Sequence, residues 1–238
     1  MNEEDEILSN TAIEFIKKEK RKLIEKFAND KQYPSVNNPV SAFMAGSPGA
    51  GKTEFSKRLI NDYLSKDGIN GVVRIDPDDI RLLLPGYTGK NSSVFQRAAT
   101  IGVEKLVDYS MVKNKNFVLD GTLFNFDVAC KNIDRSLKHK RIVLIVYVYQ
   151  DPIVAWGFTQ KREALEKRNI PKDAFIEQFL SAKNTVNRLK EKYGDQTQIW
   201  LIEKNFEQNM ERLHLNIDKI DNYLKFPYSK KEDLETLI

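Results

Sequence analysis

The sequence is poor in the residue types that build secreted, metal-bound or fibrous proteins. Its 238 residues include one cysteine, Cys130, which agrees with a reducing compartment. Two histidines, His139 and His214, leave too few ligands for a structural zinc site. Glycine and proline number only 11 and 8, which excludes a collagen-like or low-complexity chain. What remains is an ordinary globular composition, with 41% hydrophobic and 30% charged residues.

Long apolar runs are also missing, and nothing in the sequence approaches a transmembrane helix. Met1 to Asp30 has no apolar core segment, and Glu3, Glu4, Asp5 and Glu6 stand where a signal peptide carries positive charge. We therefore expect a cytoplasmic protein without a membrane partner. The net charge of +4 suits an anionic small-molecule ligand but is too weak to indicate nucleic acid.

Apolar runs and helical stretches alternate through the middle of the chain. The predicted strands are Val40 to Ala45, Val72 to Ile75, Phe117 to Leu119, Ile142 to Tyr149 and Ile199 to Ile202. The predicted helices are Lys52 to Lys66, Ser93 to Lys113, Asp127 to Leu137, Ile153 to Lys167 and Lys172 to Lys192. Strand and helix in alternation predict an α/β fold, with about five mostly parallel strands and helices on both faces of the sheet.

Both ends of the chain add to this core. We expect an N-terminal helical extension over residues 1–39, a core over 40–204 and a C-terminal helical appendage over 205–238. Ile7 to Phe27 has a helical apolar period, and its one or two helices either pack on the core or cover the nucleotide site. From Phe206 to Leu224, apolar residues recur at steps of three and four. This stripe predicts a helix that packs on the core or, alternatively, forms a seam with a partner.

The stretch "GSPGAGKT" matches the phosphate-loop pattern G-x-x-x-x-G-K-[ST] at every fixed position. Its glycines let successive backbone N–H groups point at phosphate oxygens, and the loop opens the next helix at its positive end. Lys52 is predicted to reach the β- and γ-phosphates, and the Thr53 hydroxyl to hold Mg²⁺. The predicted cofactors are therefore ATP and Mg²⁺. The predicted nucleotide-binding residues are Gly46, Ser47, Pro48, Gly49, Ala50, Gly51, Lys52 and Thr53.

A phosphate loop alone does not separate an ATPase, a GTPase and a kinase. Neither N-K-x-D nor D-x-x-G, the guanine-reading and switch motifs of a GTPase, occurs in the chain. Acidic and basic residues at the strand ends are instead typical of small-molecule kinases. A nucleic-acid kinase and a regulatory module that binds ATP without transferring phosphate stay open as alternatives.

Two predicted strands end in a carboxylate. In an open α/β sheet, ligands bind at the carboxyl ends of strands, so Asp76 is expected beside the phosphate loop. It is predicted to accept the proton of an acceptor hydroxyl, with a magnesium ligand or a helix cap as alternatives. Asp78 is the preferred cap of the helix that follows. Asp120, in "FVLDGT", is predicted to bind the metal or its water, next to Gly121 and Thr122.

Basic residues follow the fourth predicted strand. Arg162 and Arg168 are predicted to close over the transferring phosphate, because negative charge spreads over its oxygens during transfer. Glu104 lies on the helix between the Asp76 and Asp120 strands, where it either binds a sugar hydroxyl of the acceptor or faces solvent.

These residues together resemble the zeta toxins, P-loop kinases of bacterial toxin–antitoxin systems. The matching stretches are "GSPGAGKT", "RIDPDDIR", "GVEKL", "FVLDGT" and "FTQKRE…KRNIP", in the order of the family and within Val40 to Ile202. The sixteen-residue step from Glu104 to Asp120 also fits the family. The resemblance implies a P-loop kinase fold and transfer of phosphate from ATP, with Mg²⁺, to the 3′-hydroxyl of UDP-N-acetylglucosamine. It also implies that an antitoxin protein is a partner.

Carried over by position, the resemblance places Lys52 and Thr53 on the nucleotide and metal and makes Asp76 the general base. It places Glu104 and Thr122 near the acceptor, and Arg162 with Arg168 on the phosphates. Two features depart from the family. Asp120 and Leu123 stand where its best-known members carry Glu and Gly, and the second arginine follows the first by only six residues. Phosphoryl transfer is therefore better supported than the identity of the sugar nucleotide.

Overall fold

A computed structural model describes residues 2–64, 71–166, 170–205, 210–225, 228 and 230–238. At its centre is one six-stranded sheet with the order β2-β3-β1-β4-β5-β6. Neighbouring strands from β1 to β5 pair in parallel, and β6 runs antiparallel to β5. The predicted parallel sheet is confirmed, with one strand more than expected. The strands are β1 Val40–Ala45, β2 Val72–Ile75, β3 Asn116–Leu119, β4 Ile142–Tyr149, β5 Thr197–Asn205 and β6 Met210–His214.

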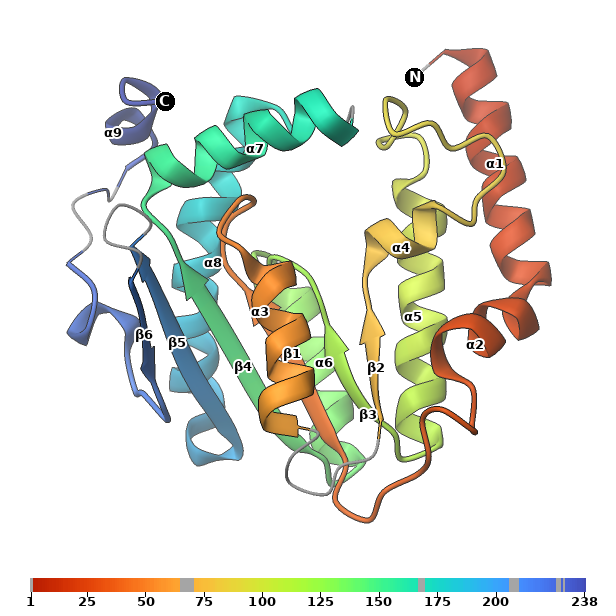
Figure 1. The fold of residues 1–238 in the computed structure, drawn as a ribbon, viewed down its shortest axis with the longest axis horizontal. Coiled ribbons are helices and arrows are strands. Elements are labelled where there is room, and N and C mark those ends of the chain that lie inside the picture. Colours follow the sequence, from red (N-terminus) through yellow and green to blue (C-terminus); the bar gives the residue numbers. More distant parts are fainter. Residues whose placement is uncertain (1, 65–70, 167–169, 206–209, 226–227, 229) are drawn as a thin grey trace.

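Helices cover both faces of this sheet. In Figure 1, α3 lies in front of β1, while α5, α6 and α8 lie behind the sheet. In the described part of the chain no helix is long and apolar enough to cross a membrane. The α-helices are α1 Glu3–Lys18, α2 Lys20–Ala28, α3 Lys52–Arg58, α4 Pro77–Arg81, α5 Gln96–Val112, α6 Phe126–Lys138, α7 Pro152–Glu166, α8 Lys172–Tyr193 and α9 Lys231–Glu235. A π-helical turn, Leu59–Leu64, continues α3.

Strand β4 shows why the sheet needs cover on both faces. Its sequence is almost wholly apolar, and successive side chains of a strand point to opposite faces. One set joins the core under α5, α6 and α8, and the other joins the core under α3. The two sets are Val143, Ile145 and Tyr147 on the first face and Leu144, Val146 and Val148 on the second.

The strand order places the carboxyl end of β1 at the centre of the molecule. From β1 the chain crosses to β2, returns through β3, and then continues on the other side of β1 with β4 and β5. This reversal makes the carboxyl end of β1 the switch point at which open α/β sheets bind ligands. The phosphate loop begins there.

The N-terminal helices pack on the core, beside α5. Figure 1 shows α1 at the edge of the molecule, next to α5 and away from α3. Helix α1 buries Ala12, Ile13 and Ile16 in the main core. After α2, Asp30 forms an ion pair of 2.7 Å with the buried Lys115, just before β3. In the described residues the extension therefore packs on the core beside α5.

The predicted helix between Phe206 and Leu224 is wrong where the structure describes it. Met210–His214 is strand β6, with Leu213 opposite Ile202 of β5. The free edge of β5 offers a row of unpaired backbone groups, and pairing them outweighs the local helical period. Ile217 and Ile220 are still buried, but through irregular chain and a short 3₁₀ turn that reach the main core.

Candidate active site

The phosphate loop joins β1 to α3, and its backbone runs against neighbouring backbone. Gly46, Gly49 and Gly51 all have positive φ, at 129°, 72° and 81°. A Cβ atom on Gly46 would lie 2.3 Å from the carbonyl oxygen of Val148 in β4, and one on Gly49 would lie 2.0 Å from that of Ala155 in α7. Only glycine fits these positions, because both the conformation and the space exclude a side chain. The loop therefore has the tight curl that its sequence predicts.

A serine of α3, Ser56, links the end of the phosphate loop to Asp120. Lys52 folds back across the loop, where its Nζ donates to the carbonyl oxygen of Ser47 at 2.5 Å. One turn into α3, the Ser56 hydroxyl contacts both the carbonyl oxygen of Thr53 at 2.9 Å and Oδ2 of Asp120 at 3.0 Å. Ser56 thus links the backbone of Thr53 to the carboxylate of Asp120.

These residues fit a magnesium ion that arrives with a nucleotide. Among the residues that the structure describes, no group of three or more His, Cys, Asp or Glu side chains could hold a metal ion. Mg²⁺ does not need such a cage, since proteins usually hold it with one or two carboxylates together with phosphate oxygens. Both hydrogen bonds that Asp120 accepts in the described region reach Oδ2, and the Thr53 hydroxyl is an oxygen ligand of the kind that Mg²⁺ prefers.

Arg74 of β2 contacts three carboxylates at this edge of the sheet. Its Nη2 donates to Oδ2 of Asp76 and, at 2.7 Å, to Oδ2 of Asp120. Its Nη1 donates to Asp79 at 2.6 Å, and its Nε to the Ser56 hydroxyl at 3.3 Å. We call these five residues the Arg74 cluster. Sequence reasoning missed Arg74, whose signal was a basic residue inside an otherwise apolar strand.

Asp76 directly follows the end of β2, as the sequence predicts, and it also caps α4. Its Oδ1 accepts from the backbone N–H of Asp78 at 2.8 Å. The prediction that Asp78 is the cap is therefore wrong, and Asp78 instead pairs with the buried Arg81. Burial, with the nearby charges of Asp120 and Asp78, raises the pKa of Asp76 to about 6, although Arg74 opposes the shift. The carboxyl group is thus ionised at neutral pH but unusually basic.

Three further predicted residues, Thr122, Glu104 and Arg162, are not members of the Arg74 cluster. The carbonyl oxygen of Thr122 accepts from the N–H of Gly46 at 3.1 Å, so the loop after β3 is tied to the phosphate loop. Glu104 lies on an exposed part of α5. Arg162 is exposed on α7, which in Figure 1 crosses the carboxyl edge of the sheet above α3. Arg168 lies outside the described residues.

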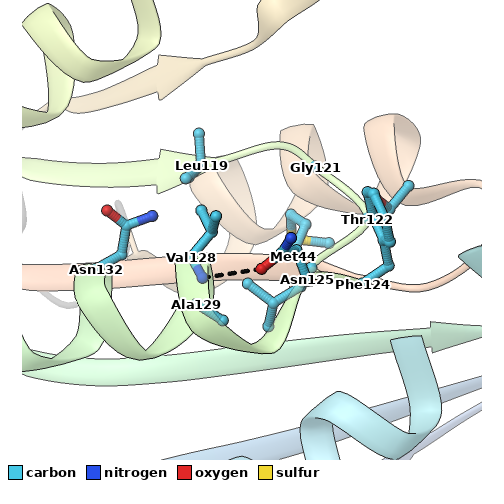
Figure 2. Close-up of a pocket in the computed structure, with 10 residues that line it drawn as sticks. Met44, Leu119, Gly121, Thr122, Phe124, Asn125, Val128, Ala129 and Asn132 are labelled. Carbon is cyan, nitrogen blue, oxygen red and sulfur yellow. Dashed lines mark hydrogen bonds between the residues drawn. The ribbon is translucent and has the colours of Figure 1, made fainter. Parts of the chain in front are cut away.

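A pocket of about 150 Å³ opens beside Thr122, between the end of β3 and the start of α6. Figure 2 shows its apolar side chains together with Asn125, whose Oδ1 accepts from the N–H of Val128 at 3.0 Å. The lining of this pocket comes from β1, β3, α6 and the loop between β3 and α6. The lining residues are Met44, Leu119, Gly121, Thr122, Leu123, Phe124, Asn125, Val128, Ala129 and Asn132.

The strand order, the glycine-rich loop after β1 and the helices on both faces define a P-loop kinase-like fold. The model of the zeta toxin family matches residues 24–218, which is most of the chain. The chain therefore belongs to the zeta toxin family. No curated protein matches it in sequence.

Solved structures agree on the fold at low sequence identity. The chain is similar to a structure from the PezAT chromosomal toxin–antitoxin system of the human pathogen Streptococcus pneumoniae, with 18% identity and a TM-score of 0.69. That match covers 94% of this chain and 92% of the other. A second similar structure is that of AvrRxo1-ORF1 with AvrRxo1-ORF2 and ATP, at 12% identity and a TM-score of 0.61. It covers 91% of this chain and 70% of the other.

Proposed function

We propose that this protein is an ATP-dependent phosphotransferase that acts on a hydroxyl of UDP-N-acetylglucosamine or a similar nucleotide sugar. One observation carries the proposal. A complete phosphate loop lies beside two buried carboxylates, Asp76 and Asp120, at the ends of adjacent strands. A module that only binds nucleotide needs the loop but has no use for a basic carboxylate next to it.

The phosphate loop binds the donor in this proposal. Its backbone N–H groups and the start of α3 face the phosphates, and Lys52 exchanges its contact with the Ser47 carbonyl for the β- and γ-phosphates. Thr53 and Asp120 would hold Mg²⁺, which would supply positive charge against the phosphate oxygens. Arg162 and Arg168 are assigned to the same developing charge, from α7 and the segment after it.

Asp76 is the general base. It takes the proton of the acceptor hydroxyl as the oxygen attacks the γ-phosphorus of ATP, while the bond from that phosphorus to the β,γ-bridging oxygen breaks and ADP leaves. The new bond thus forms without leaving a positive charge on the acceptor oxygen. A pKa of about 6 leaves most of the group ionised at neutral pH and still makes it a better proton acceptor than a solvated aspartate. Glu104 and Thr122 are assigned to the acceptor.

Membership of the family supports the choice of a nucleotide sugar and of an antitoxin partner. The family is one of toxin–antitoxin kinases, and two similar structures come from the PezAT toxin–antitoxin system and an ORF1–ORF2 complex. In this chain the departures at Asp120 and Leu123 leave room for a different sugar nucleotide. The acceptor must therefore be identified by experiment.

Incubation with γ-labelled ATP, Mg²⁺ and a panel of acceptors tests the proposal. The panel contains UDP-N-acetylglucosamine, related nucleotide sugars and an oligonucleotide with a free 5′-hydroxyl. We expect label in a nucleotide sugar, and none with Lys52→Ala. If only the oligonucleotide became labelled, the acceptor would be a nucleic acid and not a nucleotide sugar. Tight ATP binding without transfer to any acceptor would favour a regulatory module.

Expression in a bacterial host tests the partner. We expect growth arrest with the parent sequence and normal growth with Lys52→Ala at equal protein level. If both cultures grow alike, the protein is not a toxin in that host and the case for an antitoxin is lost.

A further inference from the structure

The Arg74 cluster joins four elements through one guanidinium group. Strand β2 supplies Arg74, α4 supplies its cap Asp76 and Asp79, the residue after β3 is Asp120, and α3 supplies Ser56. All three nitrogens of the guanidinium donate, since Nε reaches Ser56 of α3. Strands β2 and β3 are adjacent and in register, with Ile75 opposite Leu119, so their terminal carboxylates must come close.

The two carboxylates with assigned roles share a single nitrogen. Oδ2 of Asp76 and Oδ2 of Asp120 both accept from Nη2 of Arg74. Their side chains are only 11% and 4% exposed, so solvent screens their mutual repulsion weakly. Asp79, at 42% exposed, is a partner at the rim. A cation in contact with both buried carboxylates offsets their mutual repulsion and lets them lie side by side.

We propose that Arg74 is a positioning residue, which holds the Asp76 carboxylate in its orientation beside Asp120. This inference rests on the proposed kinase function. Arg74 is not assigned to contact ATP or the acceptor itself.

Hydrogen-bond accounting supports this role. Oδ1 of Asp76 accepts from the N–H of Asp78, and Oδ2 accepts from Arg74. Both oxygens are thereby fixed, and each keeps a further lone pair that can receive the proton of a hydroxyl. Held in this way, the Asp76 carboxylate has one fixed orientation beside Asp120. The arrangement gives one carboxylate to the acceptor and the other to the metal.

Three variants of Arg74 test the role. Arg74→Met keeps an apolar stem but removes the charge and the donors, while Arg74→Lys keeps the charge but loses the planar fork that reaches several partners. We expect kcat to fall about 10²-fold in Arg74→Met, as for a displaced catalytic group, with KM for ATP unchanged. Arg74→Lys should lie between this variant and the parent. In Arg74→Ala, free guanidinium at concentrations far below those that unfold proteins should restore part of kcat.

Arg135→Met is the matched control, because Arg135 also pairs with an aspartate, Asp108, but between the exposed faces of α5 and α6. It should leave kcat unchanged. A rise in KM for ATP with unchanged kcat in Arg74→Met would overturn the proposal and make Arg74 a phosphate ligand. A second pair of results would also overturn the proposal. In that case Arg74→Lys would be folded but as inactive as Arg74→Met, and guanidinium would restore no activity to Arg74→Ala.

A crystal structure of unliganded Arg74→Met separates this inference from the kinase proposal. We expect the carboxylates of Asp76 and Asp120 to move from their positions in the parent. If the parent transfers phosphate to no acceptor, the proposed function fails, but this comparison still decides the role of Arg74. Identical carboxylate positions in the two structures would overturn it.

Discussion

The phosphate loop and the Arg74 cluster lie at the same edge of the sheet but are held in different ways. The loop is fixed by backbone, because Gly46 and Gly49 leave no room for a Cβ atom beside β4 and α7. The cluster is fixed by side chains, through a guanidinium that contacts residues 2, 5 and 46 positions away in the chain. The donor side is therefore held by backbone packing and the side of the base by contacts between charged side chains.

This difference assigns separate tasks to the two regions. A rigid backbone cradle suits phosphates, which every nucleotide donor presents in the same form. A charged cluster suits the acceptor side, where proton transfer needs a carboxylate of adjusted basicity. Substitutions in the loop should thus change nucleotide binding, and substitutions in the cluster should change the chemical step.

The largest expected effect is on transfer by Asp76→Asn. The amide keeps the size of the side chain but cannot take a proton, so phosphoryl transfer should fall by about 10²- to 10⁴-fold. Affinity for ATP should stay close to that of the parent, because the loop is untouched. Single-turnover transfer and calorimetric ATP binding on the same preparation measure both quantities. Equal loss of binding and transfer would mean that the two regions are not separate.

Gly49→Ala should have the converse effect. The added Cβ would lie 2.0 Å from the Ala155 carbonyl oxygen, at a residue with φ of 72°. Strain and overpacking together are expected to weaken ATP binding by about 10²-fold. Titration with a fluorescent ATP analogue measures the loss. Unchanged affinity would show that α7 yields easily and that the loop is not rigid.

The raised pKa of Asp76 predicts that this residue destabilises the folded protein at neutral pH. Its pKa rises from 3.8 to about 6 on folding, so the stabilising contribution of the bound proton is complete below pH 4 and is lost as pH rises through 6. At pH 7 the free energy of unfolding of Asp76→Asn should therefore exceed that of the parent by up to roughly 3 kcal/mol. The variant should accordingly unfold at a higher temperature. Near pH 4 the two proteins should melt alike. A lower melting temperature at pH 7 would show that the ion pair with Arg74 outweighs burial.

The same contrast explains how much could be predicted from the sequence. Strands β1, β2 and β4 were located to the residue, because buried parallel strands are apolar runs bounded by turns. The phosphate loop was complete in eight consecutive letters. Asp76 and Asp120 were found because strand ends mark the ligand edge of such a sheet.

What was missed depends on pairing between distant residues. Strand β6 exists because β5 offers an open edge, and no local pattern in Met210–His214 records that edge. Arg74 reads as an exposed strand residue until Asp120, 46 positions later, is brought beside it. The pocket beside Thr122 needs α6 to pack against the end of β3, which the sequence does not display.

The smallest expected effect comes from Gly157→Ala, the matched control for Gly49→Ala on the neighbouring helix. Gly157 lies inside α7, and a Cβ atom there would meet nothing within 4 Å. Alanine is favoured over glycine in a helix interior by up to about 1 kcal/mol, so thermal unfolding should shift upward slightly. Affinity for ATP should not change. Gly157→Ala could instead weaken ATP binding as much as Gly49→Ala is expected to. The cause would then be a disturbance of α7 as a whole, and the clash between a Cβ atom at Gly49 and the Ala155 carbonyl would no longer explain the loss.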